Sequence, residues 1–404
     1  MSTSLLYHGF GVRGYRYVKT DYEGKAMIFT MEQSRESYRC PECGSKNVIG
    51  RGKTTRRFRT VPIGGKPVFL ALDVPRVECR DCQRVRQVEL TFAEPRRHFT
   101  RSFDRYALEL SLHMTIQDTA GHLGVSWDVI KDLQKQYLQR RFAKPRLIDV
   151  KRIAIDEISV GKGHRYLTVV LDLDSGAVIH VGQGKGGEAL VAFWKRLRSS
   201  GAKVEAVATD MSSAYIEAAT KNLPKATLVF DRFHVMKLYH EKLSDLRRDL
   251  YRQLTDTLEQ DLVKGIRWLL LKRPEHLDPR RNEQARLEEA LRLNAPLATA
   301  YYLKEELREV WEQDDQAEAI AFLQDWIARA EASGVRMLLQ FAKTLRAHAW
   351  GILAWYDHPI STGPLEGTNN KIKTMKRQAY GFRDQEFLKL KILGIHETKY
   401  ALVG

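Results

Sequence analysis

The four cysteines of this 404-residue chain occur as two Cys-x-x-Cys pairs, one in CPEC and one in CRDC. Two such pairs can surround one tetrahedral Zn²⁺ with four thiolates, which leaves no open coordination position for catalysis. The 35 residues between the pairs exceed the usual ~15 to 20, but a β-rich insert (RFRTVPIGGKPVFLALDVPRVE) can fill such a gap. A redox dithiol would need only one pair. The sequence therefore predicts one structural zinc ion, bound by Cys40, Cys43, Cys79 and Cys82.

Acidic residues interrupt or end apolar strands farther along the chain. Asp156 and Glu157 stand in RIAIDEISV, where they point to opposite faces of the expected strand, and Asp210 ends VEAVATD. A carboxylate on a central strand is costly unless it is paired or binds a metal ion. Asp210 alone is most simply an N-cap residue. Asp172 in LDLD and Asp231 in FDRFH are further candidates, although each alone is more often a turn or capping residue.

A third acid stands at the head of the basic segment GPLEGTNNKIKTMKR. A helix beginning at about Leu365 would place Glu366, Asn369, Asn370 and Lys373 on one face. Such a face can bring an acid to a metal ion and a base to a phosphate. The alternative is a solvated helix with chance spacing.

Taken together, these acids predict a catalytic metal site. Two aspartates on strands and one glutamate on a helix offer oxygen ligands to two Mg²⁺ or Mn²⁺ ions. Such ions activate a water or a sugar hydroxyl and stabilise both the attacking and the leaving oxygen in phosphodiester exchange, so no side-chain nucleophile is required. We therefore expect Asp156, Asp210 and Glu366 to bind the ions, with Lys373 beside them.

The distribution of charge favours a polyanionic partner. The formal net charge is +16, of which residues 1–150 carry +11, residues 151–360 carry +1 and residues 361–404 carry +4. Clustered Lys and Arg gain affinity for nucleic acid by releasing counterions from its phosphates. Double-stranded DNA is the expected partner. Outside any recognition helix, the expected contacts are Arg56, Arg57, Asn369, Asn370, Lys376 and Arg377.

The segment TIQDTAGHLGVSWDVIKDLQ has the pattern of a helix-turn-helix. The small Ala120 lets two helices approach, and Gly124 can take the turn between them. Ser126 is expected to cap the second helix and to contact DNA together with Trp127 and Lys131, which would face a major groove. Any tight αα-hairpin can resemble this pattern, but the neighbouring cysteine pairs and the local positive charge favour DNA binding.

The expected elements divide the chain into five segments and give an α+β multidomain fold. Apolar runs with Gly and Pro precede amphipathic helices, and AKPRLID then forms a linker. From residue 151 the order is β-β-β-α-β-α-β, typical of a mixed sheet with helices packed on it, and a long all-helical stretch follows. The segments are a zinc-binding ribbon (1–95), a helix-turn-helix (96–147), the first part of a catalytic core (148–236), an all-α insertion (237–350) and the helical C-terminal part of the core (351–404).

The sequence also argues against secretory and membrane proteins. The first residues lack the apolar core of a signal peptide, and no apolar run approaches the ~20 residues that span a bilayer. We expect a cytoplasmic, nucleoid-associated protein with no membrane partner.

These motifs resemble the DDE transposases of bacterial insertion sequences, and within them the ISL-three family. The likeness runs over nearly the whole chain: the paired cysteines, the helix-turn-helix, AIDE, ATDM, DRFHV, the helical insertion, GPLEGTNNKIK and YGFRD. It implies an RNase H-like core whose DDE triad falls on Asp156, Asp210 and Glu366, with the lysine of many DDE enzymes on Lys373. It further implies binding of terminal inverted repeats, metal-dependent strand cleavage, and attack of the freed 3′-hydroxyl on target DNA.

Some assignments stay open from the sequence. Asp231 and His234 of DRFHV are expected near the end of a strand, where they would support the site. A metal-dependent nuclease or junction resolvase would share the carboxylates, and a zinc-ribbon and helix-turn-helix regulator derived from a transposase would share the N-terminal modules. Because two DNA ends must be paired, we expect a homodimer or larger assembly on DNA.

Overall fold

The computed structural model describes residues 4–161 and 163–396. The chain folds as two compact units, which we describe separately. The first unit comprises residues up to 143 together with 374–391, and the second comprises residues 144–373 together with 392–396. The end of the expected C-terminal segment, residues 397–404, lies outside the described part of the chain.

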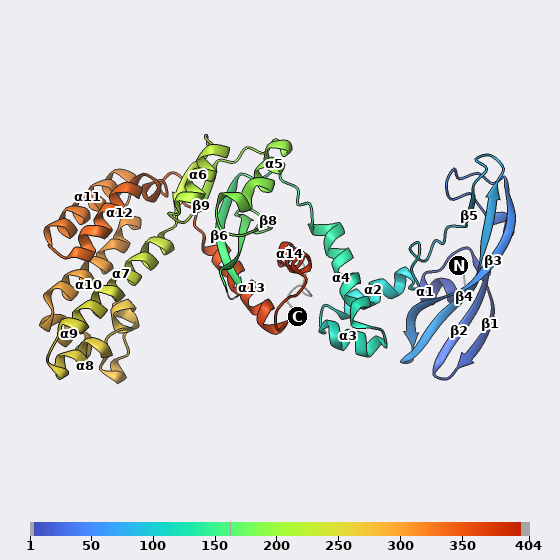
Figure 1. The fold of residues 1–404 in the computed structure, drawn as a ribbon, viewed down its shortest axis with the longest axis horizontal. Helices are drawn as coiled ribbons and strands as arrows, with labels where there is room; N and C mark the ends of the chain where they lie inside the picture. The colour runs from blue at the N-terminus through green and yellow to red at the C-terminus, as the bar shows by residue number, and fades with distance from the viewer. Residues whose placement is uncertain (1–3, 162, 397–404) are drawn as a thin grey trace. The chain divides into compact units, whose positions relative to one another are not determined.

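A five-stranded sheet forms the N-terminal part of the first unit (Figure 1). Strands β1 and β2 form one antiparallel hairpin, β3 and β4 form another, and β2 pairs with β4 in parallel. The β3–β4 hairpin is the expected insert between the cysteine pairs. It turns at Gly64 and Gly65, whose φ angles of 54° and 76° favour glycine. The elements are α1 (Leu5–Phe10), β1 (Tyr15–Glu23), β2 (Ala26–Gln33), β3 (Val48–Ile63), β4 (Lys66–Cys79) and β5 (Val85–Gln87).

The expected helix-turn-helix follows as α2 (Arg101–Leu110), α3 (Ile116–Leu123) and α4 (Trp127–Phe142). The Thr115 side chain accepts a hydrogen bond from the Asp118 amide at the start of α3, and Gly124 ends α3 with φ of 63°. Ser126 occupies the N-cap position of α4, but the prediction that its side chain caps the helix is wrong because it makes no capping hydrogen bond. The last residues of α13 (Gly363–Gln378) and most of α14 (Gln385–Leu393) complete the first unit.

The second unit contains a five-stranded mixed sheet with the order β10-β9-β6-β7-β8. Strands β6, β7 and β8 form an antiparallel meander, and β9 and β10 add in parallel on the open side of β6. Helices α5 and α6 supply buried side chains to a core with β6, β7 and β8. This is the predicted RNase H-like arrangement. Its elements are β6 (Arg152–Gly161), β7 (Arg165–Asp172), β8 (Val178–Gln183), α5 (Val191–Ser200), β9 (Ala206–Thr209), α6 (Ser213–Asn222) and β10 (Thr227–Phe230).

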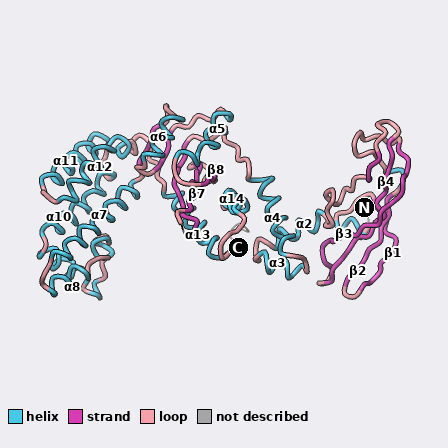
Figure 2. Tube along the Cα trace, in the orientation of Figure 1, coloured by secondary structure: helices cyan, strands magenta, loops and turns pink. Residues whose placement is uncertain are grey.

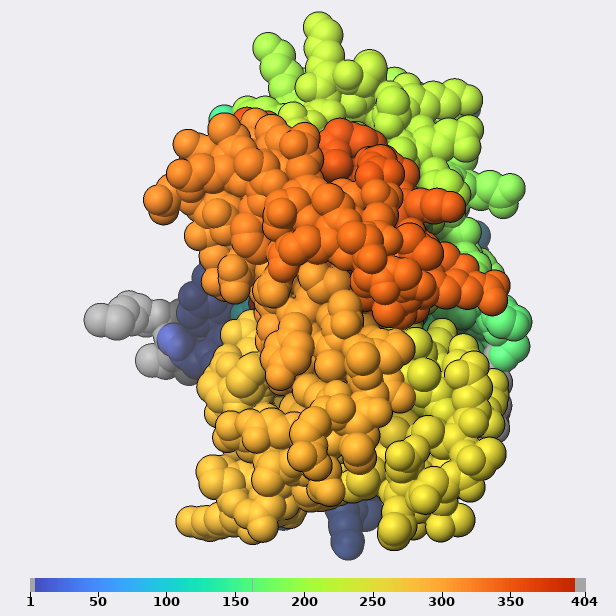
Figure 3. All heavy atoms as spheres, turned by 90° about the vertical axis from the view of Figure 1, so that its left-hand side faces the viewer, coloured from blue at the N-terminus to red at the C-terminus, as the bar shows by residue number. Residues whose placement is uncertain are grey.

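A helical insertion lies between β10 and α13. Residues 232–353 contain helices and turns and no strand, so this stretch is cyan and pink in Figure 2. Tyr239, Trp326 and Phe341 pack edge to face in its core. In the space-filling view of Figure 3, the yellow and orange atoms of this insertion form a closely packed surface. The helices are α7 (Arg232–Gln253), α8 (Thr257–Gly265), α9 (Glu283–Leu293), α10 (Ala295–Leu307), α11 (Gln316–Ala332) and α12 (Arg336–Leu353).

The insertion is joined to the sheet by a close contact at Gly351 of α12. A Cβ atom at this position would lie 2.5 Å from the Phe230 ring, which ends β10. Gly351→Ala is therefore expected to lower the free energy of unfolding by about 1–3 kcal/mol, because the ring must shift within a packed core. Thermal and urea unfolding measure the change.

The matched control is Gly121→Ala, another helical glycine. A Cβ atom there would meet no atom within 4 Å, so this variant is expected to be neutral or up to about 1 kcal/mol more stable. Equal stability of the two variants would contradict the contact at Phe230.

None of the helices in the described part of the chain combines the length and apolar character needed to cross a membrane.

Candidate active site

Three aspartates lie where three adjacent parallel strands run toward their carboxyl ends. Strand pairing joins Ala154 of β6 to Ala208 of β9, and Thr209 of β9 to Phe230 of β10. Continuing this register by one or two residues sets Asp156, Asp210 and Asp231 at the same edge of the sheet. Parallel strands lie ~4.8 Å apart, and ligand sites in such sheets form at this edge. The fold thus places acids from distant parts of the sequence together.

Asp156 is held by defined hydrogen bonds. The Asn369 side-chain amide donates to its Oδ2 at 2.8 Å, and the Glu157 backbone amide donates to its Oδ1 at 2.8 Å. The His234 Nε2 lies 3.9 Å from its Oδ1. Burial raises the pKa of Asp156 to about 6, even though His234 acts in the opposite direction. This carboxyl group is therefore costly to ionise without a cation beside it.

A second network ties the start of α13 to the end of β10. The buried Asp231 carboxylate accepts hydrogen bonds from the Thr362 hydroxyl at 2.8 Å and from the Thr362 amide at 3.3 Å. His234 Nδ1 lies 3.3 Å from the same carboxylate. Burial alone would raise the pKa of Asp231, but the bonds to His234 and Thr362 hold it below its usual value. The pKa of His234 is raised despite burial, because Asp231 and Asp156 favour its protonated form.

Glu366 stands in the first turn of α13, and the predicted helix is present. Its backbone amide donates to the Thr362 carbonyl oxygen at 2.8 Å, so the Asp231 network fixes the turn that carries it. Among the described residues, only the four cysteines form a group of three or more whose ligand atoms all lie within 4.8 Å of one another. The carboxylate oxygens of Asp156, Asp210 and Glu366 are not all this close together. Like-charged carboxylates repel each other, and a divalent cation draws such a set together.

The i, i+3 and i+4 spacing on α13 suggests one uniformly exposed polar face, but the residues on it differ in exposure. Asn370 and Lys373 are exposed, but Asn369 is buried and donates to Asp156. We expected Asn369 to contact DNA; the structure instead gives its amide a role in holding Asp156.

Asp172, weighed as a ligand, accepts hydrogen bonds from Ser175 in the turn after β7, in keeping with a turn residue.

The four cysteine sulfur atoms lie within 4.8 Å of one another. The Cys40–Cys82 and Cys43–Cys79 sulfur distances are 3.6 and 3.5 Å. Zn–S bonds of about 2.3 Å in a tetrahedron require sulfur separations near ~3.8 Å, so the four thiols fit a zinc ion. In the first knuckle, the turn around Cys40 and Cys43, backbone amides and chiefly that of Cys43 lower the pKa of Cys40 to about 7. The Ser45 amide acts in the same direction on Cys43, but the neighbouring thiols raise the pKa of Cys43 to about 12.

Several predicted DNA contacts already have partners within the first unit. Arg57 pairs with Glu23 at 2.7 Å, and Arg56 donates to the Arg97 carbonyl oxygen. Lys131 of α4 pairs with Asp384 at 3.2 Å. Trp127, also on α4, keeps 42% of its surface exposed. The ion pair between Lys131 and Asp384 joins residues far apart in the sequence, so no short sequence motif could have predicted it.

The basic residues after Glu366 differ in how far they are exposed to solvent. Arg377 is exposed on the last turn of α13, whereas Lys376 is half-buried there. Among the DNA contacts predicted on this helix, Arg377 and Asn370 are therefore exposed, as is Lys373, which was predicted beside the metal ions.

Family models match three segments of the chain. Residues 36–82 match the zinc-finger of transposase IS204/IS1001/IS1096/IS1165, and residues 88–138 match the helix-turn-helix domain of transposase family ISL3. Residues 153–392 match the ISL3 model described as transposase. The three matches follow the zinc ribbon, the helix-turn-helix and the mixed sheet with its insertion.

Curated relatives match along nearly the full length. The transposase for insertion sequence element IS1001 of Bordetella parapertussis is 33% identical over 389 residues, which cover 96% of this chain and 95% of the relative. The transposase for insertion sequence element IS1557 of Mycobacterium tuberculosis (strain ATCC 25618 / H37Rv) is 28% identical over 375 residues, 87% of this chain and 84% of the relative. With a family model covering more than half of its residues and a relative above 30% identity, the chain belongs to the ISL3 family of transposases.

Proposed function

We propose that this transposase cleaves DNA at the ends of an insertion sequence and joins the freed 3′-hydroxyls to target DNA, with Asp156, Asp210 and Glu366 as its catalytic metal ligands. The observation that carries the proposal is the register of the parallel strands, which brings Asp156 and Asp210 to one edge of the sheet. The hydrogen bond from Asn369 to Asp156 then sets α13, and with it Glu366, against the same edge.

The donor set suits Mg²⁺ or Mn²⁺. Carboxylate oxygens are the ligands that these hard cations prefer. Within the described residues, the buried Oδ1 of Asn369 has no hydrogen-bond partner, so one more oxygen beside Asp156 is available to a bound water or ion. When bound, two such ions would supply an activated water or 3′-hydroxyl and neutralise charge on the phosphate.

The residues of the chain then have distinct roles. Asn369 orients the Asp156 carboxylate, and the pairing of Thr362 with Asp231 fixes the first turn of α13. Lys373 lies seven residues after Glu366 on the same helix and is exposed, so its ammonium group is available to a phosphate of the strand being cut.

The test uses the full chain and duplex DNA taken from both flanks of its gene, with Mg²⁺ or Mn²⁺ added and the zinc left in place. Metal-dependent nicks with 3′-hydroxyl ends, followed by joining to a plasmid, are the expected products. Cleavage without joining would favour the nuclease alternative. Specific binding without any cleavage would favour the regulator.

Two ends must be held together for joining, so the active form on DNA is expected to be a homodimer or larger. Light scattering coupled to size exclusion, on protein bound to end DNA, measures this. A complex with one chain per DNA end and no pairing would refute it.

The contact between Thr362 and Asp231 is expected to matter for catalysis. In Thr362→Val the buried Asp231 carboxylate loses the hydroxyl donor at 2.8 Å and keeps only the backbone amide donor at 3.3 Å, so the turn that carries Glu366 is held less firmly. We expect cleavage to fall about 10- to 100-fold, as for other partners of metal ligands, with a higher Mg²⁺ concentration at half-maximal rate. Thr362→Ser keeps the hydroxyl and should restore most activity. A purely structural role would instead change thermal stability and leave the Mg²⁺ dependence as in the parent.

Metal affinity is expected to depend on pH through Asp156. Its pKa of about 6, against an ordinary 3.8, means that the protonated acid is favoured in the fold. Its contribution to stability is therefore present below pH ~4 and is lost as the pH rises through about 6. A metal ion needs the ionised form, so Mn²⁺ affinity should rise up to about tenfold per pH unit toward pH 6 and level off above it. Calorimetric titration from pH 5 to 8 measures this, and a flat profile in the parent would contradict it.

A further inference from the structure

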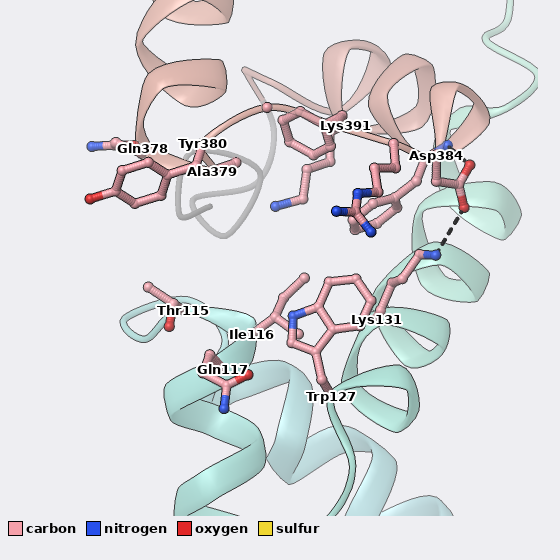
Figure 4. A pocket seen from close by; sticks show the side chains of 14 residues that line it. Thr115, Ile116, Gln117, Trp127, Lys131, Gln378, Ala379, Tyr380, Asp384 and Lys391 are labelled. Carbon is pink, nitrogen blue, oxygen red and sulfur yellow. Dashed lines mark hydrogen bonds and ion pairs between the residues drawn. The ribbon is translucent and has the colours of Figure 1, made fainter.

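A cavity of about 810 Å³ opens within the first unit, between the helix-turn-helix and the segment that follows α13 (Figure 4). The beginnings of α3 and α4 form one wall. The turn after α13 and the first turns of α14 form the other. Its chemically distinctive lining residues are Trp127, Lys131, Tyr380, Phe382, Phe387 and Lys391.

Two aromatic rings at the rim are open to solvent. Trp127 is 42% exposed in the first turn of α4, and Tyr380 is fully exposed. Tyr380 has φ of 51° in the turn that ends α13, a conformation that L-residues rarely adopt. Glycine adopts this positive φ with less strain than tyrosine, so the backbone geometry of the turn does not explain why a tyrosine is present. Exposed ring faces of this kind are platforms for the flat faces of nucleobases.

The cavity also contains positive charge. Lys391 is fully buried on α14, lies over the rings of Phe382 and Phe387 at 5.9 and 5.3 Å, and extends into the cavity in Figure 4. Lys131 lies over the Trp127 ring at 5.4 Å. Desolvation lowers the pKa of Lys391 to about 8, so most of its population is still charged at neutral pH. A nucleotide has a flat base that can stack on an aromatic ring and a phosphate that is attracted to a lysine, so this lining suits both of its parts.

The first turns of α4 are held against this cavity. Asp384 accepts from Lys135 at 3.1 Å and pairs with Lys131 at 3.2 Å, and Lys135 also pairs with Glu386 at 2.7 Å. Burial would raise the pKa of Asp384, but the Phe387 amide and the two lysines hold it at about 2. These ion pairs turn the expected recognition residues toward a pocket. A pocket of this volume is of the size that takes a small ligand, and a DNA duplex is too wide to enter it.

We propose that the cavity receives one unpaired nucleotide of the DNA that the chain binds, with its base stacked on Tyr380 and its phosphate near Lys131, behind which the buried Lys391 adds positive charge. This inference rests on the proposed binding of insertion-sequence ends and adds that the ends are held with at least one base out of the duplex. Extruding a base costs stacking and pairing energy, which the aromatic platform offsets.

The experiment measures binding of fluorescein-labelled flank DNA to the full chain, without added Mg²⁺ and without chelators. Four probes share one sequence: a blunt duplex, a duplex with a three-nucleotide 5′ overhang, one with a 3′ overhang, and one with an internal mismatch. At least one of the unpaired probes should bind about tenfold more tightly than the blunt duplex, the effect expected for stacking one base. 2-Aminopurine at the unpaired position should lose fluorescence on binding.

Tyr380→Ala should remove this preference and leave affinity for the blunt duplex unchanged, since the side chain is fully exposed and supports no core packing. Tyr22→Ala, another exposed tyrosine of the first unit (67%), is the matched control and should keep the preference. Lys391→Met tests the buried cation and should also weaken the unpaired probes selectively.

The outcomes separate the two proposals. Equal affinity of the parent for all four probes, or a preference that Tyr380→Ala retains, would overturn the nucleotide pocket and leave DNA binding standing. Failure of the parent to bind any flank probe would refute end binding itself.

Discussion

Asp156→Asn is expected to lose DNA cleavage by about 10³-fold or more while DNA binding persists. A catalytic ion contributes several kcal/mol to stabilising the transition state, and each 1.36 kcal/mol is tenfold in rate. The substitution removes one negative charge from the end of the sheet where β6 and β9 lie side by side. The side-chain carbonyl oxygen of the new asparagine can still accept the hydrogen bond that Asn369 donates to the carboxylate at 2.8 Å. The fold should therefore survive. Cleavage of labelled flank DNA, with binding measured in parallel, tests the prediction.

The matched control is the neighbouring residue. Glu157 points to the opposite face of β6, where it interacts with Tyr215 of α6, so Glu157→Gln should cleave within a few-fold of the parent. If Asp156→Asn cleaves as well as the parent, the triad assignment is wrong. If both variants fail equally, the effect comes from the strand and not from metal ligation.

Cys79→Ser is expected to remove zinc from the chain and unfold the two knuckles. Structural zinc sites contribute about 10–16 kcal/mol of apparent binding free energy at pH 7, and a serine hydroxyl does not replace a thiolate. Cys79 is buried at the end of β4, opposite Val48 of β3. The rest of the sheet has its own apolar core, which includes Phe29, Phe58 and Leu70, so the hairpin should persist. Elemental analysis should give one zinc per parent chain and none in the variant.

Limited proteolysis locates the change. New cleavage sites are expected around residues 38–47 and 80–84, with the sheet core protected. Ser45→Ala, which alters the segment beside Cys40 and Cys43 without touching a thiol, should keep its zinc. Retention of zinc by Cys79→Ser would show that the four cysteines are not the ligand set. The same variant should bind flank DNA more weakly if the ribbon contributes contacts.

The local elements of this chain could be predicted because short-range physics fixes them. The spacing within each Cys-x-x-Cys pair identified the cysteines as ligands, although the sulfur distances of 3.6 and 3.5 Å join cysteines of different pairs, which the β3–β4 hairpin brings together. Gly124 ends α3 in the left-handed conformation that only glycine adopts freely. The helical pattern after Leu365 became α13. For the two helical features, the relevant atoms lie within a few residues along the chain.

The roles of particular polar side chains could not be predicted in the same way. Ser126 has the residue type and position of a cap but makes no capping bond. Thr362 was missed because STGP reads as an ordinary helix start, and nothing near it in sequence points to Asp231. Asn369 shares a helical face with Lys373, yet it is buried and bonded to Asp156.

The sequence by itself determined which chemistry this protein carries: four thiolates for zinc, a helix-turn-helix, strand-borne aspartates and a helix-borne glutamate. Only the tertiary structure decided how these groups meet. The bonds that do so join residues 131, 213 and 249 positions apart: Thr362 with Asp231, Asn369 with Asp156, and Lys135 with Asp384. Periodicity and capping act over one or two turns, whereas such pairings depend on strand register and helix packing, which the whole fold sets.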